Sequence, residues 1–324
     1  MEKKFRKIGV LTSGGDAPGM NAAVRAVART ANARGVEVVG IYGGYRGMIH
    51  DEMIDLTNRA VSNIIDRSGT ILYSDRCLEF KEEAGMQKAI ATLKKHEIDG
   101  IVAIGGDGTF RGATDLSQRG IPTIGVPGTI DNDITASDNT IGFDTAMQTV
   151  IDNVDRLRDT CESHARCNIV EVMGRGAGYI ALWCGIANGA EKILMPEEKD
   201  YDEKALIKDI LENKKRGKKN YIIINAEGVG DSINMAKRIE DATGIETRAT
   251  ILGHMQRGGS PTCKDRVYAS TMGAMAVDLL CQGKTNRVVG YKNGQFIDFD
   301  IEEALAMKKT IPAYQYDVAK TLAL

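Results

Sequence analysis

The chain has 324 residues, of which 43% are apolar, and its formal net charge is −2. This length predicts two domains, or one large domain with a second lobe, around a sizeable core. The nearly neutral charge gives no support for a surface that binds nucleic acid or membrane. No apolar run reaches the ~20 residues of a membrane span.

The cysteines and the N-terminal stretch indicate a cytoplasmic protein. Six cysteines are scattered without a CxxC pair, which is the pattern expected of reduced thiols. The stretch MEKKFRKIGVLTSGGD is basic, but its apolar part is too short for a signal peptide. There are only four histidines and no HExxH motif, so the sequence offers no histidine-based metal site.

Strands and helices are predicted to alternate along almost the whole chain. The predicted strands are 8–11, 36–42, 100–104, 121–126, 168–173, 192–195 and 221–226. The predicted helices are 21–34, 86–96, 145–160, 203–215 and 235–243. Continuous apolar strands separated by amphipathic helices indicate βαβ units, in which helices cover both faces of a mainly parallel sheet.

A polar, glycine-containing stretch near residues 135–145 divides these units. The segment SDNTIGFD (137–144) precedes a long helical pattern, and each side of it holds its own set of βα units. The prediction is therefore an α/β protein of two similar lobes. We expect the active site in a cleft between the lobes, with ligands at the carboxyl ends of the strands.

The first glycine-rich turn follows the strand 8–11. Its glycines, Gly14, Gly15 and Gly19, allow the backbone to approach an anion closely. The spacing is that of a P-loop, but Met20 and Asn21 stand where Lys and Ser or Thr would be, so a Walker A site is rejected. No GxGxxG follows a strand, which leaves a dinucleotide-binding fold without support. A tight turn without a ligand is the alternative.

The second turn, GGDGT, follows the strand 100–104. Here Asp107 stands among glycines, and a carboxylate among bare backbone amides suits Mg²⁺ held beside phosphates. A helix N-cap is the alternative role for this aspartate. By itself the motif fits several kinase types that lack a P-loop.

The third turn, PGTIDND (127–133), follows the strand 121–126. If it is extended, Thr129, Asp131 and Asp133 lie on one side, and Ile130 and Asn132 on the other. Two acids at a strand end serve as an acid/base pair, as a metal clamp or as turn caps. The residues alone leave these three roles open.

Cationic side chains gather near later glycine turns. Arg175 follows the strand 168–173, and Arg248, His254 and Arg257 lie within GIETRATILGHMQRGGSP. Each arginine alone fits a solvated surface, but several of them beside glycine turns in a neutral protein favour phosphate binding. Arg25 and Arg29 share one helix face, and their spacing by itself favours a solvent-exposed helix surface without a ligand.

Five motifs in order, GVLTSGGDAPGMNAA, GGDGT, PGTIDND, EVMGR and ETRATILGHMQRGGSP, resemble the bacterial ATP-dependent 6-phosphofructokinase (phosphofructokinase type A) family. The resemblance runs nearly end to end. It implies phosphoryl transfer from MgATP to the 1-hydroxyl of fructose 6-phosphate, the committed step of glycolysis, with Mg²⁺ as cofactor. It also implies a larger ATP-binding domain (1–141 plus 255–305) and a smaller fructose 6-phosphate-binding domain (142–254 plus 306–324).

The same resemblance implies roles for individual residues. Asp131 matches the general base and Arg175 the residue that stabilises transferring charge, while Asp133, Thr129 and Asp107 hold the reacting groups and Mg²⁺, with Asp107 as the metal residue. The residues that match the ATP site are Gly15, Arg76, Cys77, Gly106, Asp107, Gly108 and Thr109. Those that match the substrate site are Thr129, Ile130, Asp131, Arg166, Met173, Gly174, Arg175, Glu227, Arg248, His254, Met255, Gln256 and Arg257. Of these, Arg166 and Arg248 match arginines that reach the site from a neighbouring subunit, which implies a homotetramer.

Two further expectations concern the nucleotide and effectors. Gly108 and Gly128 stand where pyrophosphate-using relatives carry Asp and Lys, which favours ATP as donor. Asp75 and Leu78, however, depart from the family's SARxPEF pattern beside the adenine.

The residues that match the effector site for ADP or phosphoenolpyruvate are Arg25, Arg29, Arg158, Gly189, Ala190, Glu191, Arg216, Lys218, Lys219 and Asn220. Because Asn58, Asn63 and Asn220 replace Arg, Asp and His of well-studied members, we expect a weaker or altered response to these effectors.

Two alternatives remain. One is a pyrophosphate-dependent kinase, or a kinase of another sugar phosphate, on the same fold. The other is a regulatory subunit without catalytic activity, which predicts damage at Asp107, Asp131 or Arg175. All three residues are intact.

Overall fold

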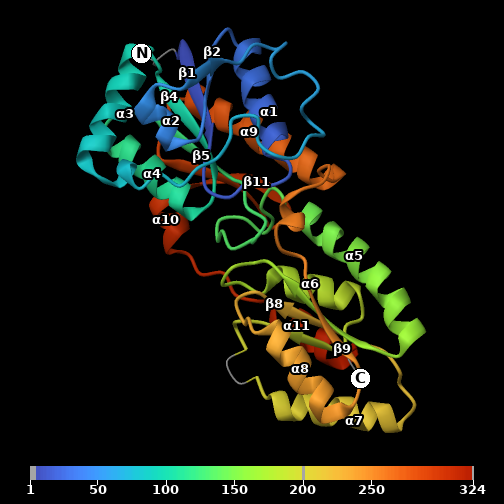
Figure 1. Cartoon of the computed structure of the whole chain (residues 1–324). Coiled ribbons are helices and arrows are strands. Elements are labelled where there is room, and N and C mark those ends of the chain that lie inside the picture. The colour runs from blue at the N-terminus through green and yellow to red at the C-terminus, as the bar shows by residue number, and fades with distance from the viewer. Residues whose placement is uncertain (1–4, 199–200, 323–324) are drawn as a thin grey trace. The chain divides into compact units, whose positions relative to one another are not determined.

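The computed structural model describes residues 5–198 and 201–322. They divide into two compact units (Figure 1). The first unit comprises 5–130, 134–145 and 257–309, and the second comprises 131–133, 146–256 and 310–322, without 199–200. Parts of the basic N-terminus (1–4) and the last residues of the predicted smaller domain (323–324) lie outside the described residues. Which ligand each unit binds stays a prediction.

A seven-stranded, mainly parallel sheet organises the first unit, in the order β11-β10-β5-β4-β1-β2-β3. Only the edge pairs β10–β11 and β2–β3 are antiparallel. Its strands are β1 (Lys7–Thr12), β2 (Glu37–Ile41), β3 (Met53–Asp55), β4 (Gly100–Gly105), β5 (Thr123–Pro127), β10 (Arg287–Lys292) and β11 (Gln295–Asp300). The central strands β1, β4 and β5 are almost wholly buried, as their continuous apolar sequences require.

Helices cover both faces of this sheet (Figure 1). One face carries α1 and α9, which pack on each other, and the other carries α2, α3 and α4 around a core that includes Phe80, Leu93 and Phe110. The helices are α1 (Met20–Ala33), α2 (Tyr45–His50), α3 (Glu83–Lys95), α4 (Asp107–Gln118), α9 (Cys263–Cys281) and α10 (Ile301–Ala306), with a 3₁₀ turn η1 (Glu79–Lys81).

The second unit has a four-stranded, wholly parallel sheet in the order β7-β8-β6-β9. Its strands are β6 (Cys167–Val172), β7 (Lys192–Leu194), β8 (Tyr221–Ala226) and β9 (Thr247–Ile251). α7 and α8 cover one face through apolar residues such as Leu206, Ile210 and Ile239, while α6 packs against β7, β8 and α11. The helices are α5 (Phe143–His164), which starts in the first unit, α6 (Tyr179–Ala187), α7 (Glu203–Lys215), α8 (Ser232–Thr243) and α11 (Ala313–Leu322), with a 3₁₀ turn η2 (Gly253–Arg257).

The α/β prediction with two mainly parallel, helix-covered sheets is confirmed. Every predicted strand and helix is present, with ends displaced by a few residues. The prediction missed β3, β9, β10 and β11 and the helices α2, α4, α6, α9, α10 and α11. Within 5–198 and 201–322, no helix is both long and apolar enough to cross a membrane. All six cysteines are free thiols.

A buried carboxylate fixes the start of α5 against α9. Asp265 is 2% exposed. It accepts hydrogen bonds from the backbone N–H groups of Gly142 (3.0 Å) and Thr145 (2.8 Å) and from the Thr145 hydroxyl (2.5 Å). Burial raises the pKa of this carboxyl to about 6, although these donors act in the opposite direction. The sequence analysis did not single out this residue.

The raised pKa of Asp265 predicts a pH-dependent stability. The folded state holds this proton more tightly than the unfolded chain, so the group stabilises the fold at acid pH, and its contribution is lost as pH rises through about 6. We expect a loss of about 2 kcal/mol between pH 4.5 and 7.5. Urea unfolding of the wild type and of Asp265→Asn at both pH values measures this loss. Parallel changes in the two proteins would contradict it.

Candidate active site

Three glycine-rich turns leave the same edge of the first unit's sheet. β1, β4 and β5 are adjacent and parallel, so their carboxyl ends lie next to one another. β1 runs into the turn 13–19, β4 into 105–109 and β5 into 128–133. In parallel α/β sheets, this edge is where ligands bind.

Hydrogen bonds tie these turns together. The N–H of Gly128 donates to the carbonyl of Gly105 at 3.0 Å, and the Thr109 hydroxyl donates to the carbonyl of Ser13 at 3.2 Å. A Cβ on Gly105 would lie 2.3 Å from Thr109 Oγ1 and 2.5 Å from the Ser13 carbonyl oxygen. Gly105 is therefore required for this close approach.

The segment 106–108 combines open space with groups that suit a metal–phosphate complex. Asp107 is the first residue of α4, so its half-buried carboxylate lies at the N-terminus of a helix, where an anion is favoured. A Cβ added at Gly106 or Gly108 would meet no atom within 4 Å. Among the described residues, no cluster of three or more His, Cys, Asp or Glu could hold a metal ion. A single carboxylate beside amides still fits Mg²⁺, which takes most of its oxygens from water and bound phosphates.

The segment PGTIDND is extended only at its start, where Pro127 ends β5 and Gly128 forms a β-bridge, so the alternation expected for an extended segment does not hold through Asp133. Asn132 has a φ of 52°, in the left-handed region, which breaks the period of two. The Thr129 N–H donates to the carbonyl of Ile141 (3.1 Å), and the Thr140 hydroxyl donates to the carbonyl of Thr129 (2.6 Å). Asp131 is 8% exposed and follows this anchored stretch.

A fourth segment, residues 73–77, docks onto the first turn. The Gly14 N–H donates to the carbonyl of Asp75 at 3.3 Å, and the Ser74 hydroxyl donates to the carbonyl of Gly14. These bonds place Arg76, which is exposed, and Cys77, which is half-buried, beside the turn 13–19. The structure therefore brings the predicted ATP residues of three separate segments into one region of the first unit.

Arg257 lies on the same turn. Its Nη1 donates to the carbonyl of Asp16 at 2.9 Å, and a Cβ on Gly15 would lie 2.6 Å from that nitrogen. Gly15 is thus required for the guanidinium to rest here. Arg257 belongs to the first unit, whereas Met173, Glu227 and most other predicted substrate residues belong to the second.

In the second unit, predicted substrate residues follow the adjacent strands β6, β8 and β9. The Arg175 N–H donates to Glu227 Oε1 at 2.6 Å, which joins the turns after β6 and β8. The Met173 N–H donates to Oε1 of Gln256, a fully buried residue after β9, at 3.1 Å. These bonds bring Met173, Arg175, Glu227 and Gln256 together, with His254 and Met255 exposed on η2.

The backbone at Gly174 and Arg175 is unusual. Gly174 has a φ of 136°, and a Cβ there would lie 2.4 Å from the carbonyl oxygen of Ala177. Arg175 has a φ of 56°, which is uncommon for a residue other than glycine. Its side chain is exposed. Strain of this kind persists where the surrounding structure imposes it, often at functional sites.

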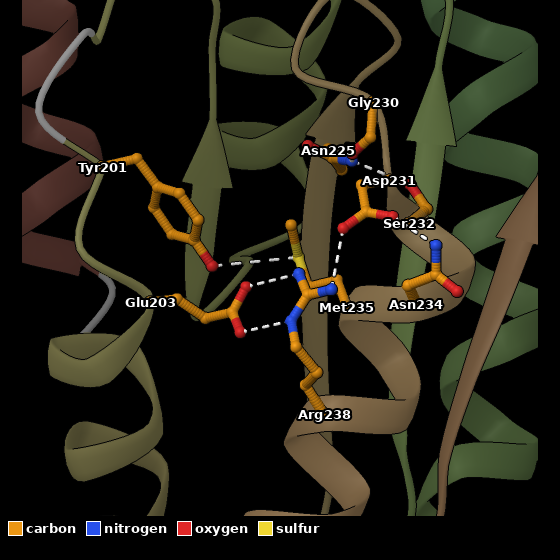
Figure 2. A network of polar contacts seen from close by, with 9 residues as sticks. All are labelled: Tyr201, Glu203, Asn225, Gly230, Asp231, Ser232, Asn234, Met235 and Arg238. Carbon is orange, nitrogen blue, oxygen red and sulfur yellow. Dashed lines mark hydrogen bonds and ion pairs between the residues drawn. The ribbon is translucent and has the colours of Figure 1, made fainter.

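A polar network, missed by the sequence analysis, holds the turn that carries Glu227 (Figure 2). Asn225, fully buried on β8, donates to the carbonyl of Gly230 at 2.9 Å and to the Ser232 hydroxyl at 2.7 Å. That hydroxyl donates to Glu171 Oε2 at 2.6 Å. These buried hydrogen bonds therefore fix the conformation of the turn between β8 and α8.

The outer side of the same network fixes the first turn of α8. Figure 2 shows Arg238 between two carboxylates, with Nη1 at 2.8 Å from Asp231 and Nε and Nη2 at 2.6 and 2.7 Å from Glu203. Hydrogen bonds from Asn234, which has the larger effect, and from Arg238 lower the pKa of the Asp231 carboxyl. The backbone of Asp231 is left-handed, with a φ of 58°. These contacts tie α8 to the start of α7.

Arg166 and Arg248 lie away from these turns. Arg166 precedes β6, and Arg248 is the second residue of β9, so both are at the amino ends of the strands. Both donate to Glu246, Arg166 at 2.7 Å and Arg248 at 2.6 Å, and these bonds lower the pKa of that carboxyl. Because β6 spans about 17 Å, the structure does not bring them to Met173 and Glu227 of the same chain.

The predicted effector residues of the second unit also gather at the amino ends of its strands. Lys218 pairs with Glu191 at 2.6 Å just before β8 and β7, and Arg158 donates to the carbonyl of Asn188. The residues grouped here are Arg158, Gly189, Ala190, Glu191, Arg216, Lys218, Lys219 and Asn220. Arg25 and Arg29 lie on α1 of the first unit, and their part in such a site stays a prediction.

Comparisons with known proteins show the family to which the chain belongs. Residues 7–280 match the phosphofructokinase family. A Clostridium botulinum protein named ATP-dependent 6-phosphofructokinase is 55% identical over 98% of this chain and 100% of its own length. A Brevibacillus brevis protein of the same name is 54% identical over 99% and 100%.

Solved structures share the fold. Phosphofructokinase from Saccharomyces cerevisiae aligns with a TM-score of 0.85 and 32% identity, over 98% of this chain and 48% of that chain, so this chain spans about half of the yeast protein. A pyrophosphate-dependent phosphofructokinase from Marinobacter aquaeolei aligns with a TM-score of 0.86 at 22% identity, over 98% and 91%, which shows the fold alone. The chain belongs to the phosphofructokinase family.

Proposed function

We infer that the chain transfers the γ-phosphoryl group of ATP to the 1-hydroxyl of fructose 6-phosphate, giving fructose 1,6-bisphosphate and ADP in glycolysis. The observation that carries this inference is the 55% identity, over 98% of the chain, to relatives named for this activity. The meeting of the three glycine turns at the ends of β1, β4 and β5 supports it. The cytoplasm, where glycolysis runs, is the proposed location.

Asp131 acts as the general base in this mechanism. Its carboxylate takes the proton of the 1-hydroxyl as that oxygen attacks the γ-phosphorus, and the bond from phosphorus to the β–γ bridging oxygen breaks, so the electron pair leaves with ADP. Thr129 and Asp133 orient the reacting groups. Asp131 is nearly buried, which limits competition from water.

Charge neutralisation and positioning supply the rest of the catalysis. Arg175 stabilises the transferring phosphoryl group, and the amides of 106–109 together with Gly15, Arg76 and Cys77 bind ATP. Asp107 would hold Mg²⁺, which offsets phosphate charge when it is bound. The 6-phosphate binds to His254 and Arg257, with Met173, Gly174, Glu227, Ile130, Met255 and Gln256 around the sugar.

Arg166 and Arg248 complete the 6-phosphate site of a neighbouring subunit in a homotetramer. Their place at the amino ends of the second unit's strands supports this role, because they do not reach the turns of their own chain there. ADP and phosphoenolpyruvate bind the effector residues weakly or with an altered effect. Rate curves against fructose 6-phosphate with and without each effector test this, and strong ordinary shifts would contradict it.

A coupled assay with fructose 6-phosphate tests the function directly. We expect turnover with MgATP and only background turnover with pyrophosphate. Turnover with pyrophosphate alone would favour the pyrophosphate-dependent alternative. No turnover with either donor would favour a regulatory subunit.

Gly108 provides a sharper test of the donor. A carboxylate fits here without distortion, since a Cβ meets nothing within 4 Å and the position is helical. In Gly108→Asp this carboxylate would repel the phosphates of ATP, and we expect KM for ATP to rise about tenfold or more. Gly108→Ala is the matched control and should stay near wild type. An equal rise in both variants would show that space, and not charge, decides binding at this position.

A further inference from the structure

The segment 73–77 is joined to the nucleotide site through Asp75. Its carbonyl accepts the Gly14 N–H at 3.3 Å, and its Oδ1 accepts the Arg76 N–H at 2.7 Å. The same residue thus fixes the backbone of Arg76 and docks it on the first glycine turn. Yet its second carboxylate oxygen adds negative charge beside residues proposed to bind a polyanion.

Arg46, the second residue of α2, offsets this charge. Its Nε lies 3.1 Å from Asp75 Oδ2, and its Nη1 lies 3.0 and 2.9 Å from the two carboxylate oxygens of Glu52. The Glu52 and Asp75 carboxylates raise the pKa of the Arg46 guanidinium. One guanidinium therefore bridges the two acids, with Nη1 directed to Glu52 and Nε to Asp75.

The backbone at Gly43 leaves room for this guanidinium. Gly43 has a φ of 63°, and a Cβ there would lie 2.6 Å from Nη2 of Arg46. A larger residue would be strained and would also displace the arginine. The position of Arg46 over residue 43 is thus set by the backbone and by Glu52 together.

This pair contributes little to folding. The Arg46 and Asp75 side chains are 38% and 49% exposed, and ion pairs with this exposure add little to stability. Their effect on a nearby anion is different. An uncompensated carboxylate beside bound phosphates disfavours binding, and a paired one does not.

We propose that Arg46 is a positioning residue for the nucleotide: it acts through Asp75, whose carboxylate it neutralises beside the turn 13–19. The proposal rests on the proposed function for ATP as the ligand. It predicts that removing Arg46 harms ATP binding because Asp75 remains. Removing Asp75 as well should then reverse most of the harm.

Four variants test this pair: Arg46→Met, Arg46→Lys, Asp75→Ala and the double variant Arg46→Met/Asp75→Ala. We expect Arg46→Met to raise KM for ATP about three- to fivefold, with kcat and KM for fructose 6-phosphate unchanged. Arg46→Lys keeps the charge and should stay within about twofold of wild type. Asp75→Ala keeps the carbonyl that accepts the Gly14 N–H but loses the bond from Oδ1 to the Arg76 N–H, so we expect it to raise KM for ATP less than Arg46→Met does. The double variant should return to about twofold.

The matched control is Arg119→Met. Arg119 lies in the same unit, and its side chain, which is 32% exposed, pairs with Glu83 at 2.6 Å, away from the nucleotide turns. It should leave KM for ATP unchanged, and thermal unfolding checks that every variant folds.

Calorimetric titration with MgATP measures binding without turnover. A wild type that binds ATP but does not turn over would contradict the proposed function alone. Unchanged ATP binding in Arg46→Met, or a double variant as weak as Arg46→Met, would overturn the pairing.

Discussion

Replacing Asp131 with asparagine is expected to lower kcat by about 10²- to 10⁴-fold, with little change in KM for ATP or fructose 6-phosphate. The amide has the size of the carboxylate and can still accept a hydrogen bond from the sugar hydroxyl, but it cannot take the proton. The position is nearly buried, so water is a poor substitute for the missing base. The coupled assay at saturating substrates measures kcat, and titration of each substrate measures KM.

Asp138→Asn is the matched control for this variant. It makes the same chemical change on an exposed residue of the segment between β5 and α5. We expect kcat near that of the wild type, and thermal unfolding confirms that both variants fold. An unchanged kcat in Asp131→Asn would contradict the general-base role. A raised KM at unchanged kcat would assign Asp131 to substrate binding instead.

The sequence predicted those elements whose own residues determine them. β8 is a run of six buried residues, and α7 has an amphipathic pattern with an aspartate cap at Asp202, so both match their predicted bounds. α6 was missed because YIALWCGIA is apolar almost all round and shows no helical period. β10 and β11 were missed because they are partly exposed and their pattern mixes charged and apolar residues. Such segments take their structure from partners distant in the sequence.

The same division holds for the candidate site. Glycine turns after buried strands predict residues that gather at one edge of a sheet, and 105–109 and 128–130 do so. The roles of Asp265 and Arg46 could not be predicted, because their partners lie far along the chain or in the backbone of another turn. The left-handed φ of Asn132 was not predicted for a local reason: the apolar strand before it favours a continued extended pattern. Asparagine after a strand could have signalled this turn.

Substitution of Arg166 and Arg248 is expected to have the second large effect, on the affinity for fructose 6-phosphate. A chain with both arginines changed to alanine should lose much of its affinity for fructose 6-phosphate, because charge-assisted bonds to phosphate are strong. We expect KM to rise at least about tenfold. The same chain keeps Asp131 and should keep its affinity for ATP. Loss of the bonds to Glu246 is the structural alternative, and Glu246→Gln, which retains both arginines, is the control for it.

Hybrid oligomers distinguish a neighbour's arginines from a chain's own. Asp131→Asn chains and Arg166→Ala/Arg248→Ala chains are mixed in equal amounts, dissociated and reassociated, and assayed at the wild-type KM for fructose 6-phosphate. If each site takes Asp131 from one chain and both arginines from its neighbour, about a quarter of randomly formed sites are intact. The mixture should then recover at least about a quarter of the wild-type rate, whereas the mean of the two parents is at most about a tenth of it. If each site uses its own chain's arginines, every site carries one defect, and the rate stays at the mean of the two parents. Native mass spectrometry of the mixture shows whether the two kinds of chain have exchanged, so a low rate cannot be attributed to failed assembly.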